Sequence, residues 1–186
     1  MDPRYIIIAG TNGAGKTTLY ETNPELFQIT RVNVDEIVRE FGSWTNFSDV
    51  MKAGQIALKR IMDCFDKKIS FNQETTLCGH SIKNNNKRAI SLGYNVEIYY
   101  IGLDTADLAV DRVMKRVEKG GHGIPEDDIR RRYEESLRAL KELIPLCDIV
   151  RVYDNSEFFH IVAFFSNGEC LYKAKPLPEW CKKVFE

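Results

Sequence analysis

Short apolar runs alternate with amphipathic segments over most of the chain. Residues 5–9 are a continuous apolar run that stops at a glycine, which is typical of a strand buried on both faces of a parallel sheet. Over residues 49–68, apolar positions recur near helical spacing and predict a long amphipathic helix. The same patterns predict further strands at residues 28–34, 69–74, 96–103 and 148–153, and further helices at 16–23, 81–92, 105–119 and 126–143. A short helix that begins at residue 35 or 36 and ends at residue 41 is also predicted.

Two aromatic-rich runs near the C-terminus, residues 158–165 and 169–174, flank Ser166-Asn167-Gly168. An Asn-Gly pair between two such runs is a strong β-hairpin signal. Before this hairpin, strands and helices alternate, which predicts an α/β fold with a parallel sheet. We expect one domain over residues 1–186, with a mostly parallel, five-stranded central sheet and an antiparallel hairpin at about residues 157–175.

The loop after the first predicted strand carries a complete phosphate-binding motif. Its sequence, GTNGAGKT at residues 10–17, matches G-x-x-x-x-G-K-[ST] between an apolar strand and a helix. Glycines let backbone N–H groups surround phosphate oxygens, and the helix directs its positive end at the same anion. The motif predicts a three-layer P-loop NTPase sandwich that binds ATP and Mg²⁺, with Lys16 on the phosphates and Thr17 on the metal. The predicted nucleotide-binding residues are Gly10, Thr11, Asn12, Gly13, Ala14, Gly15, Lys16, Thr17 and Thr18.

Other residues separate the classes of P-loop protein. The guanine-reading Asn-Lys-x-Asp motif of GTPases is missing, because the pair Asn86-Lys87 is followed by Arg88-Ala89. The sequence lacks a Leu-Ser-Gly-Gly-Gln-like signature, which argues against an ABC-type ATPase. A helicase or motor would need a longer chain and further motifs. A small-molecule kinase instead needs a carboxylate near the γ-phosphate and an arginine-bearing, mobile lid.

Two carboxylates follow predicted strands at the edge where open α/β sheets bind ligands. We interpret Asp35, after the second strand, as the general base or the carboxylate that orients the acceptor hydroxyl; the alternative is a cap on the following helix. Glu74 ends the third strand, and with Thr75 it is a candidate for binding the acceptor. Glu74 has two alternatives, a water on Mg²⁺ or a cap on the next turn.

Arginines flank a glycine-rich hinge at residues 120–123, in a helical lid expected at about residues 105–143. Because successive helical residues point about 100° apart, at most two of three successive arginines in the second lid helix can face one site. We take Arg116 and Arg131 as catalytic lid residues, the alternative being a solvated basic face paired with acidic neighbours. The candidates for phosphate contact are Arg112, Arg116, Arg130, Arg131 and Arg132.

Four further side chains have two interpretations each. His122 lies in the hinge, where a loop role is more usual than contact with phosphate. Trp44, Phe47 and Tyr133 are candidates for the wall of an acceptor pocket, although packing is the more usual role of an aromatic side chain.

Composition sets limits on location and partners. The net charge is −1 and the pI is near 6.3, which gives no basic field of the kind that nucleic-acid-binding proteins use. The five cysteines are widely spaced and form no C-x-x-C pair, so neither a disulfide framework nor a zinc site is indicated. The apolar run at residues 5–9 is too short for a signal peptide or a membrane span, so we expect a cytoplasmic protein.

Several segments together carry a family resemblance between residues 5 and 156. In chain order they read IAGTNGAGKTT, NVDEI, FNQETTL, RVEKGGHGIPEDDIRRRYEESL and VYDNS. These segments resemble the zeta-toxin-like P-loop kinases, and within them the short bacterial branch often labelled predicted ABC-type ATPases. The chain is shorter than the well-studied toxins, and its arginine spacing around the hinge departs from theirs.

The resemblance implies a reaction and a role for each matching residue. Zeta toxins are ATP-dependent kinases that phosphorylate the sugar 3′-hydroxyl of UDP-N-acetylglucosamine. By this resemblance Lys16 and Thr17 serve ATP and Mg²⁺, and Asp35 takes the place of the catalytic aspartate. Glu74 takes that of the substrate-binding glutamate, and the phosphate-clamping arginines correspond to Arg116 and residues 130–132.

These observations favour a kinase that transfers the γ-phosphoryl group of ATP to a hydroxyl of a nucleotide sugar. The main alternative is an ATP-hydrolysing switch or binding module without a small-molecule acceptor. A nucleic-acid end kinase that uses the arginine-rich surface is a weaker alternative. The resemblance also makes an antitoxin protein a possible partner, whereas neither a membrane nor a nucleic acid is expected to be one.

Overall fold

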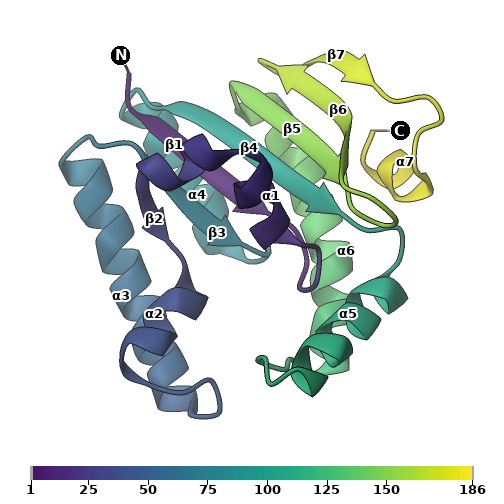
Figure 1. Cartoon of the computed structure of the whole chain (residues 1–186). Coiled ribbons are helices and arrows are strands. Elements are labelled where there is room, and N and C mark those ends of the chain that lie inside the picture. The colour runs from purple at the N-terminus through teal and green to yellow at the C-terminus, as the bar shows by residue number, and fades with distance from the viewer. Residues whose placement is uncertain (1, 186) are drawn as a thin grey trace.

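The structure is a computed structural model that describes residues 2–185. Within these residues the chain forms a seven-stranded sheet in the order β2-β3-β1-β4-β5-β6-β7, with helices on both faces (Figure 1). The strands are β1 (Arg4–Ala9), β2 (Thr30–Val32), β3 (Phe71–Thr75), β4 (Asn95–Gly102), β5 (Ile149–Asp154), β6 (His160–Ser166) and β7 (Glu169–Lys173). The helices are α1 (Lys16–Thr22), α2 (Val34–Phe41), α3 (Phe47–Asp66), α4 (His80–Ser91), α5 (Ala106–Glu118), α6 (Glu126–Leu143) and α7 (Glu179–Phe185), with the short 3-10 helices η1 (Pro24–Gln28) and η2 (Ile144–Leu146).

The five strands β2, β3, β1, β4 and β5 pair in parallel, and the hairpin β6–β7 continues the sheet antiparallel to β5. The predicted α/β fold, with a mostly parallel five-stranded sheet and a C-terminal hairpin, is therefore confirmed. The hairpin belongs to the same sheet because β6 pairs directly with β5 along its length.

The central strand β1 fixes the position of the phosphate-binding loop. Its residues from Tyr5 to Ala9 are fully buried between β3 and β4. Helix α1 lies on one face of the sheet, while α4 and α6 lie on the other (Figure 1). The Tyr5 ring packs on Phe71 in a tilted contact and on Phe65 in an edge-to-face contact, with centroid distances of 4.8 and 5.7 Å. Tyr94 extends this cluster through edge-to-face contacts with Phe65 and Phe71. This packing anchors β1, and the carboxyl end of β1 leads straight into the loop.

Two helical arms extend beyond the carboxyl ends of the parallel strands. Helices α2 and α3 form one arm, and α5 with the start of α6 forms the other, with the loop after β1 between them (Figure 1). No helix among the described residues combines the length and the apolar content that crossing a membrane requires. The arms place residues 34–50 and 106–132, which are far apart in the sequence, on two sides of the loop.

Two elements differ from the sequence expectation. The second strand is only Thr30–Val32, because Pro24–Gln28 forms a 3-10 helix and Asn33 already caps α2. Helix α7 was not expected from the pattern, and it is held by burial of Trp180, Cys181 and Val184.

A buried asparagine ties β3 to η1. Asn72 is 0% exposed, donates to the Leu26 carbonyl at 2.7 Å and accepts from the Tyr20 hydroxyl at 3.0 Å. We predict that Asn72→Ala lowers the free energy of unfolding by about 2–3 kcal/mol, because a buried carbonyl loses its donor. Denaturant unfolding measures the change, and Asn84→Ala on the exposed face of α4 is the control, expected to shift it by less than about 0.5 kcal/mol. Equal effects of the two substitutions would contradict this role of Asn72.

Candidate active site

The loop between β1 and α1 has the shape of a phosphate cradle. Gly10 has φ 147°, and a Cβ there would lie 2.4 Å from the Ile101 carbonyl oxygen, so only glycine fits against the end of β4. Gly15 has φ 91° and is the residue from which α1 begins. The loop backbone therefore turns around the N-terminus of α1, where unpaired N–H groups favour an anion.

Lys16 places its ammonium group across this cradle. Its Nζ donates to the carbonyl oxygens of Gly10 at 2.9 Å and Thr11 at 3.3 Å. Burial lowers the pKa of Lys16, while the carboxylates of Glu74 and Asp35 act against that shift. The Lys16 side chain therefore lies where the loop meets the two predicted carboxylates.

Asp35 is the second residue of α2, and its neighbour Asn33 caps the helix. The Asn33 side-chain oxygen accepts from the Asp35 backbone N–H at 2.8 Å. The alternative interpretation of Asp35 as the helix cap is thus wrong, because Asn33 fills that position. The Asp35 carboxylate is partly buried and lines a cavity on each side of it.

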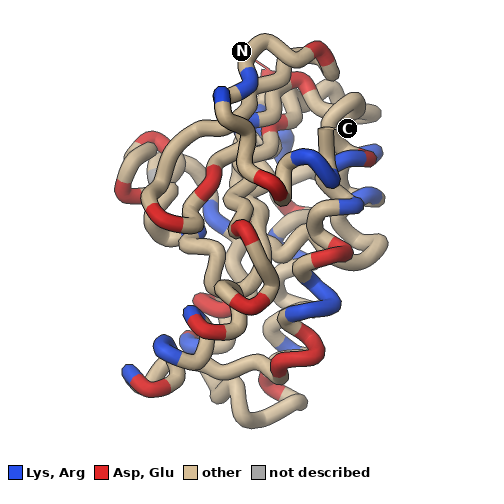
Figure 2. Tube along the Cα trace, turned by 90° about the vertical axis from the view of Figure 1, so that its right-hand side faces the viewer, with Lys and Arg blue, Asp and Glu red and all other residues tan. Residues whose placement is uncertain are grey.

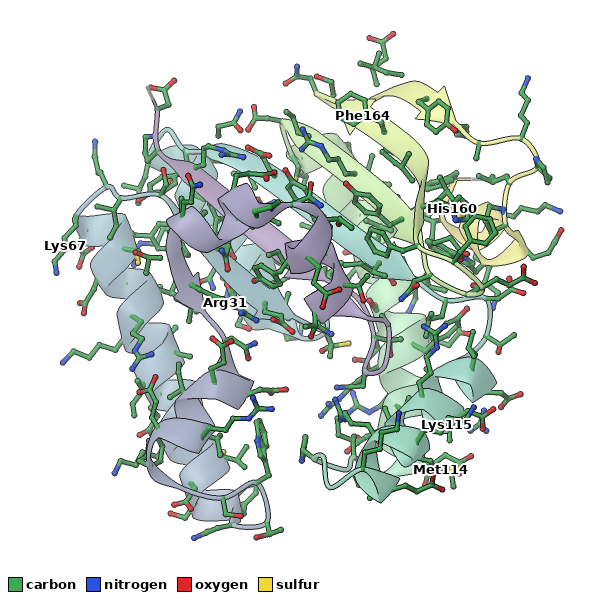
Figure 3. All side chains as sticks on the ribbon, viewed as in Figure 1. Arg31, Lys67, Met114, Lys115, His160 and Phe164 are labelled. Atoms are coloured by element: carbon green, nitrogen blue, oxygen red, sulfur yellow. The ribbon has the colours of Figure 1, made fainter. Side chains whose placement is uncertain are left out.

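Glu74 is held in place by two donors. Its Oε2 accepts from the Arg31 guanidinium at 2.7 Å and from Asn33 Nδ2 at 2.8 Å. Arg31 extends from β2 beside α1, where its guanidinium lies 4.0 Å from the centroid of the Tyr20 ring (Figure 3). Sequence reasoning missed Arg31 and Asn33, whose role depends on the β2–β3 pairing. The cap on the turn after β3 is Thr75, whose hydroxyl accepts from the Leu77 N–H at 3.0 Å.

The arginines of α5 reach the loop. Arg112 and Arg116 line the same cavity as Lys16 and Thr17. Arg112 donates to the Ser156 carbonyl at 2.9 Å, and Arg116 donates to the His122 carbonyl at 2.6 Å. The Arg116 Nε is buried without a hydrogen-bond partner among the described residues, so this guanidinium retains a donor for an anion.

The arginines of α6 divide between two faces. Arg132 donates to Asn12 in the loop at 3.2 Å, whereas Arg131 pairs with Asp128 and Glu135 on its own helix. Arg130 is likewise exposed and ion-paired with acidic residues. The expectation that Arg131 faces the phosphates is not met, because the helical rotation turns Arg132 to the loop instead. Acidic and basic residues are interspersed on this side of the molecule (Figure 2).

Two cavities meet at the loop. One, the loop cavity, has a volume of about 450 Å³ and is lined by the glycine loop, Thr17 and the α5 arginines. The other, the aromatic cavity, has a volume of about 570 Å³ and lies between α2–α3 and the α5–α6 connection. Their shared wall consists of Asn12, Lys16, Asn33, Asp35 and Glu74.

Aromatic side chains line the second cavity. Trp44 stacks on His122 with ring centroids 4.1 Å apart and an angle of 25° between the planes, which links the two arms. Phe47 also lines this cavity. Tyr133 instead lies in the core and donates to the carbonyls of Leu103 and Asp104, so its role is packing.

The sheet order, the glycine loop and the arginine-bearing arm define a P-loop kinase-like fold. The Zeta toxin family model matches residues 1–163, and the chain therefore belongs to the Zeta toxin family. An uncharacterized protein of Haemophilus influenzae is 33% identical over 133 residues, which are 72% of this chain and 94% of that protein.

Solved structures share the fold at low sequence identity. A structure from the PezAT chromosomal toxin–antitoxin system of Streptococcus pneumoniae has a TM-score of 0.69 and 17% identity, covering 99% of this chain and 79% of that chain. The AvrRxo1-ORF1:-ORF2 structure with ATP has a TM-score of 0.78 and 16% identity, covering 98% of this chain and 63% of that one. This chain thus spans less than two thirds of the AvrRxo1 chain that it matches.

The Trp44–His122 stack is expected to depend on pH. Burial lowers the pKa of His122, with Arg116 and Arg132 acting in the same direction and Asp35 against it. The neutral ring therefore stabilises the stack above the ordinary histidine pKa of about 6.5, and this contribution is lost as pH falls through the lower pKa of the folded state. We predict that tryptophan emission changes below about pH 6.5 in the wild type and that this change disappears in His122→Gln. Identical pH profiles for the two proteins would refute the prediction.

Proposed function

We propose that this protein is an ATP-dependent phosphotransferase whose loop cavity holds the nucleotide and whose aromatic cavity holds the acceptor. The observation that carries the proposal is the shared wall, where Lys16 and Asp35 face both cavities. A group transferred from one cavity to the other passes this wall. Membership of the Zeta toxin family supports the same reaction class.

Residues of the wall and the arginines near it have defined tasks in this proposal. Lys16 and Arg116 neutralise charge on the phosphates, and Arg132 does so from the start of α6 in the same arm as Arg116. Asp35 accepts the proton of the acceptor hydroxyl or orients that hydroxyl toward the phosphorus. Glu74 binds the acceptor, and Arg31 and Asn33 fix the position of its carboxylate.

The residues present fit ATP with Mg²⁺. The glycine loop offers backbone N–H groups, and Thr17 offers an exposed hydroxyl in the first turn of α1. The described residues contain no cluster of three or more His, Cys, Asp or Glu side chains that could hold a metal ion. A hydroxyl plus phosphate oxygens and waters is the usual Mg²⁺ environment in P-loop proteins, where the ion neutralises developing charge.

We further propose a nucleotide sugar such as UDP-N-acetylglucosamine as the acceptor. The aromatic cavity has a polar end at Asp35 and Glu74 and an apolar end at Trp44 and Phe47, which suits a ligand with hydroxyls and a planar base. An antitoxin protein is a proposed partner, since the structurally similar PezAT protein comes from a toxin–antitoxin system and AvrRxo1-ORF1 was solved together with AvrRxo1-ORF2.

Replacing the proposed base separates transfer from binding. We predict that Asp35→Asn lowers phosphoryl transfer roughly 10²- to 10⁴-fold and leaves ATP affinity nearly unchanged, because the amide cannot accept a proton. The measurement is transfer of label from γ-labelled ATP to a metabolite panel that includes UDP-N-acetylglucosamine. Asp66→Asn, an exposed carboxylate at the end of α3, is the control and should keep full activity.

The same assay distinguishes the alternative function. An ATP-hydrolysing switch would release inorganic phosphate without any acceptor and would keep this activity in Asp35→Asn. Absence of labelled product from every acceptor, together with unchanged hydrolysis in Asp35→Asn, would replace the kinase proposal with the switch.

The α6 arginines provide an internal comparison. We predict that Arg132→Ala lowers the transfer rate at least about tenfold, because it removes a cation facing the loop. Arg131→Ala should have little effect, since Arg131 lines neither cavity and its guanidinium is paired with Asp128 and Glu135 on its own helix. Initial rates at saturating ATP measure both variants. A larger loss in Arg131→Ala than in Arg132→Ala would contradict the assignment of Arg132 to the phosphates.

A further inference from the structure

The C-terminal helix α7 packs its tryptophan against the carboxyl ends of β4 and β5. Trp180 is 1% exposed, and its ring lies 5.9 Å from the Tyr100 ring, centroid to centroid. A Cβ at Gly102 would lie 2.2 Å from the indole ring, so the absence of a side chain there makes room for Trp180. The indole Nε1–H donates to Asp154 Oδ1 at 2.7 Å.

Asp154, at the end of β5, is a buried carboxylate that gathers several donors. Besides the indole, Oδ2 accepts from the Ser156 N–H at 3.0 Å, and Oδ1 accepts from the Ser156 hydroxyl at 2.7 Å. The Ser156 hydroxyl oxygen accepts in turn from the Asp104 N–H at 2.9 Å. A buried carboxylate is stable only when its oxygens are satisfied, so these bonds fix the turn at residues 154–156.

This turn contacts the nucleotide side of the site at two points. Asn155 Nδ2 donates to the Ala14 carbonyl in the glycine loop at 2.9 Å and occupies the space next to Gly15 where a Cβ would clash. Arg112, which lines the loop cavity, donates to the Ser156 carbonyl at 2.9 Å. The turn therefore holds the glycine loop and the α5 arm in a fixed relation.

We infer that Trp180 is a positioning residue for nucleotide binding: through Asp154 it holds the 154–156 turn against the glycine loop and Arg112. The inference rests on the proposed function, since it assumes that ATP occupies the loop cavity. The family match ends at residue 163, so Glu179–Phe185 lies outside it and family membership says nothing of this helix. Loosening the turn lowers the affinity of the glycine loop for ATP, while Lys16 and Asp35, which act at the point of transfer, stay in place.

The test is the affinity of the full chain for ATP with Mg²⁺, measured by calorimetric titration. Trp180→Phe keeps an aromatic ring and removes the N–H donor, and we expect the Kd for ATP to rise about tenfold. The KM for ATP rises in parallel, and kcat at saturating ATP stays within about twofold. Val184→Ala removes buried packing from the same helix without touching the hydrogen bond, and it should leave the Kd unchanged.

Two further measurements guard against a folding defect. Ser156→Ala removes the two bonds of the Ser156 hydroxyl, to Asp154 and from the Asp104 N–H, without altering the buried face of α7, and it should also raise the Kd for ATP. In Trp44→Phe, Trp180 is the remaining one of the two tryptophans, and its emission should change on addition of ATP. A wild-type chain that binds no ATP overturns the proposed function and this inference with it. Wild-type binding that is unaltered in Trp180→Phe and Ser156→Ala overturns the positioning role alone.

Discussion

A partly buried ammonium group beside two carboxylates is the interaction on which the proposed site depends. The carbonyls of Gly10 and Thr11 hold Lys16 at the carboxyl end of the parallel sheet. Burial disfavours the charge of the lysine, and Glu74 and Asp35 counter that effect. In the proposed reaction, Lys16 places positive charge beside the phosphates, and Asp35 places negative charge where the acceptor hydroxyl loses its proton. Both cavities converge on it.

Asn33 connects the backbone to this charge arrangement. Its side-chain oxygen caps α2 at Asp35, and its side-chain nitrogen donates to Glu74, so one amide orients the elements that carry both carboxylates. Arg31 pairs with Glu74 from the neighbouring strand β2. The register of β2 on β3 therefore sets the geometry of the acceptor side, just as the burial of β1 sets that of the glycine loop.

The sequence was sufficient for features that depend on local pattern and insufficient for those that depend on pairing across the sheet. The apolar run of β1, the glycine loop and the Asn167-Gly168 hairpin turn are local, and each was predicted where the structure has it. The sequence selected Arg131, whereas the structure turns Arg132 to the loop and pairs Arg131 on its own helix, because the rotation of a helix is fixed only by tertiary packing. Likewise, α7 is a short helix with a weak pattern, and it is stabilised by a buried tryptophan rather than by its own periodicity.

The most direct test of the central claim is a crystal structure of the protein with Mg²⁺ and a non-hydrolysable ATP analogue. The account predicts the terminal phosphate within hydrogen-bond distance of Lys16 Nζ, with the Asp35 carboxylate facing it from the wall shared by the two cavities. A nucleotide bound elsewhere, or an Asp35 side chain turned away from the terminal phosphate, would contradict the proposed transfer between the cavities.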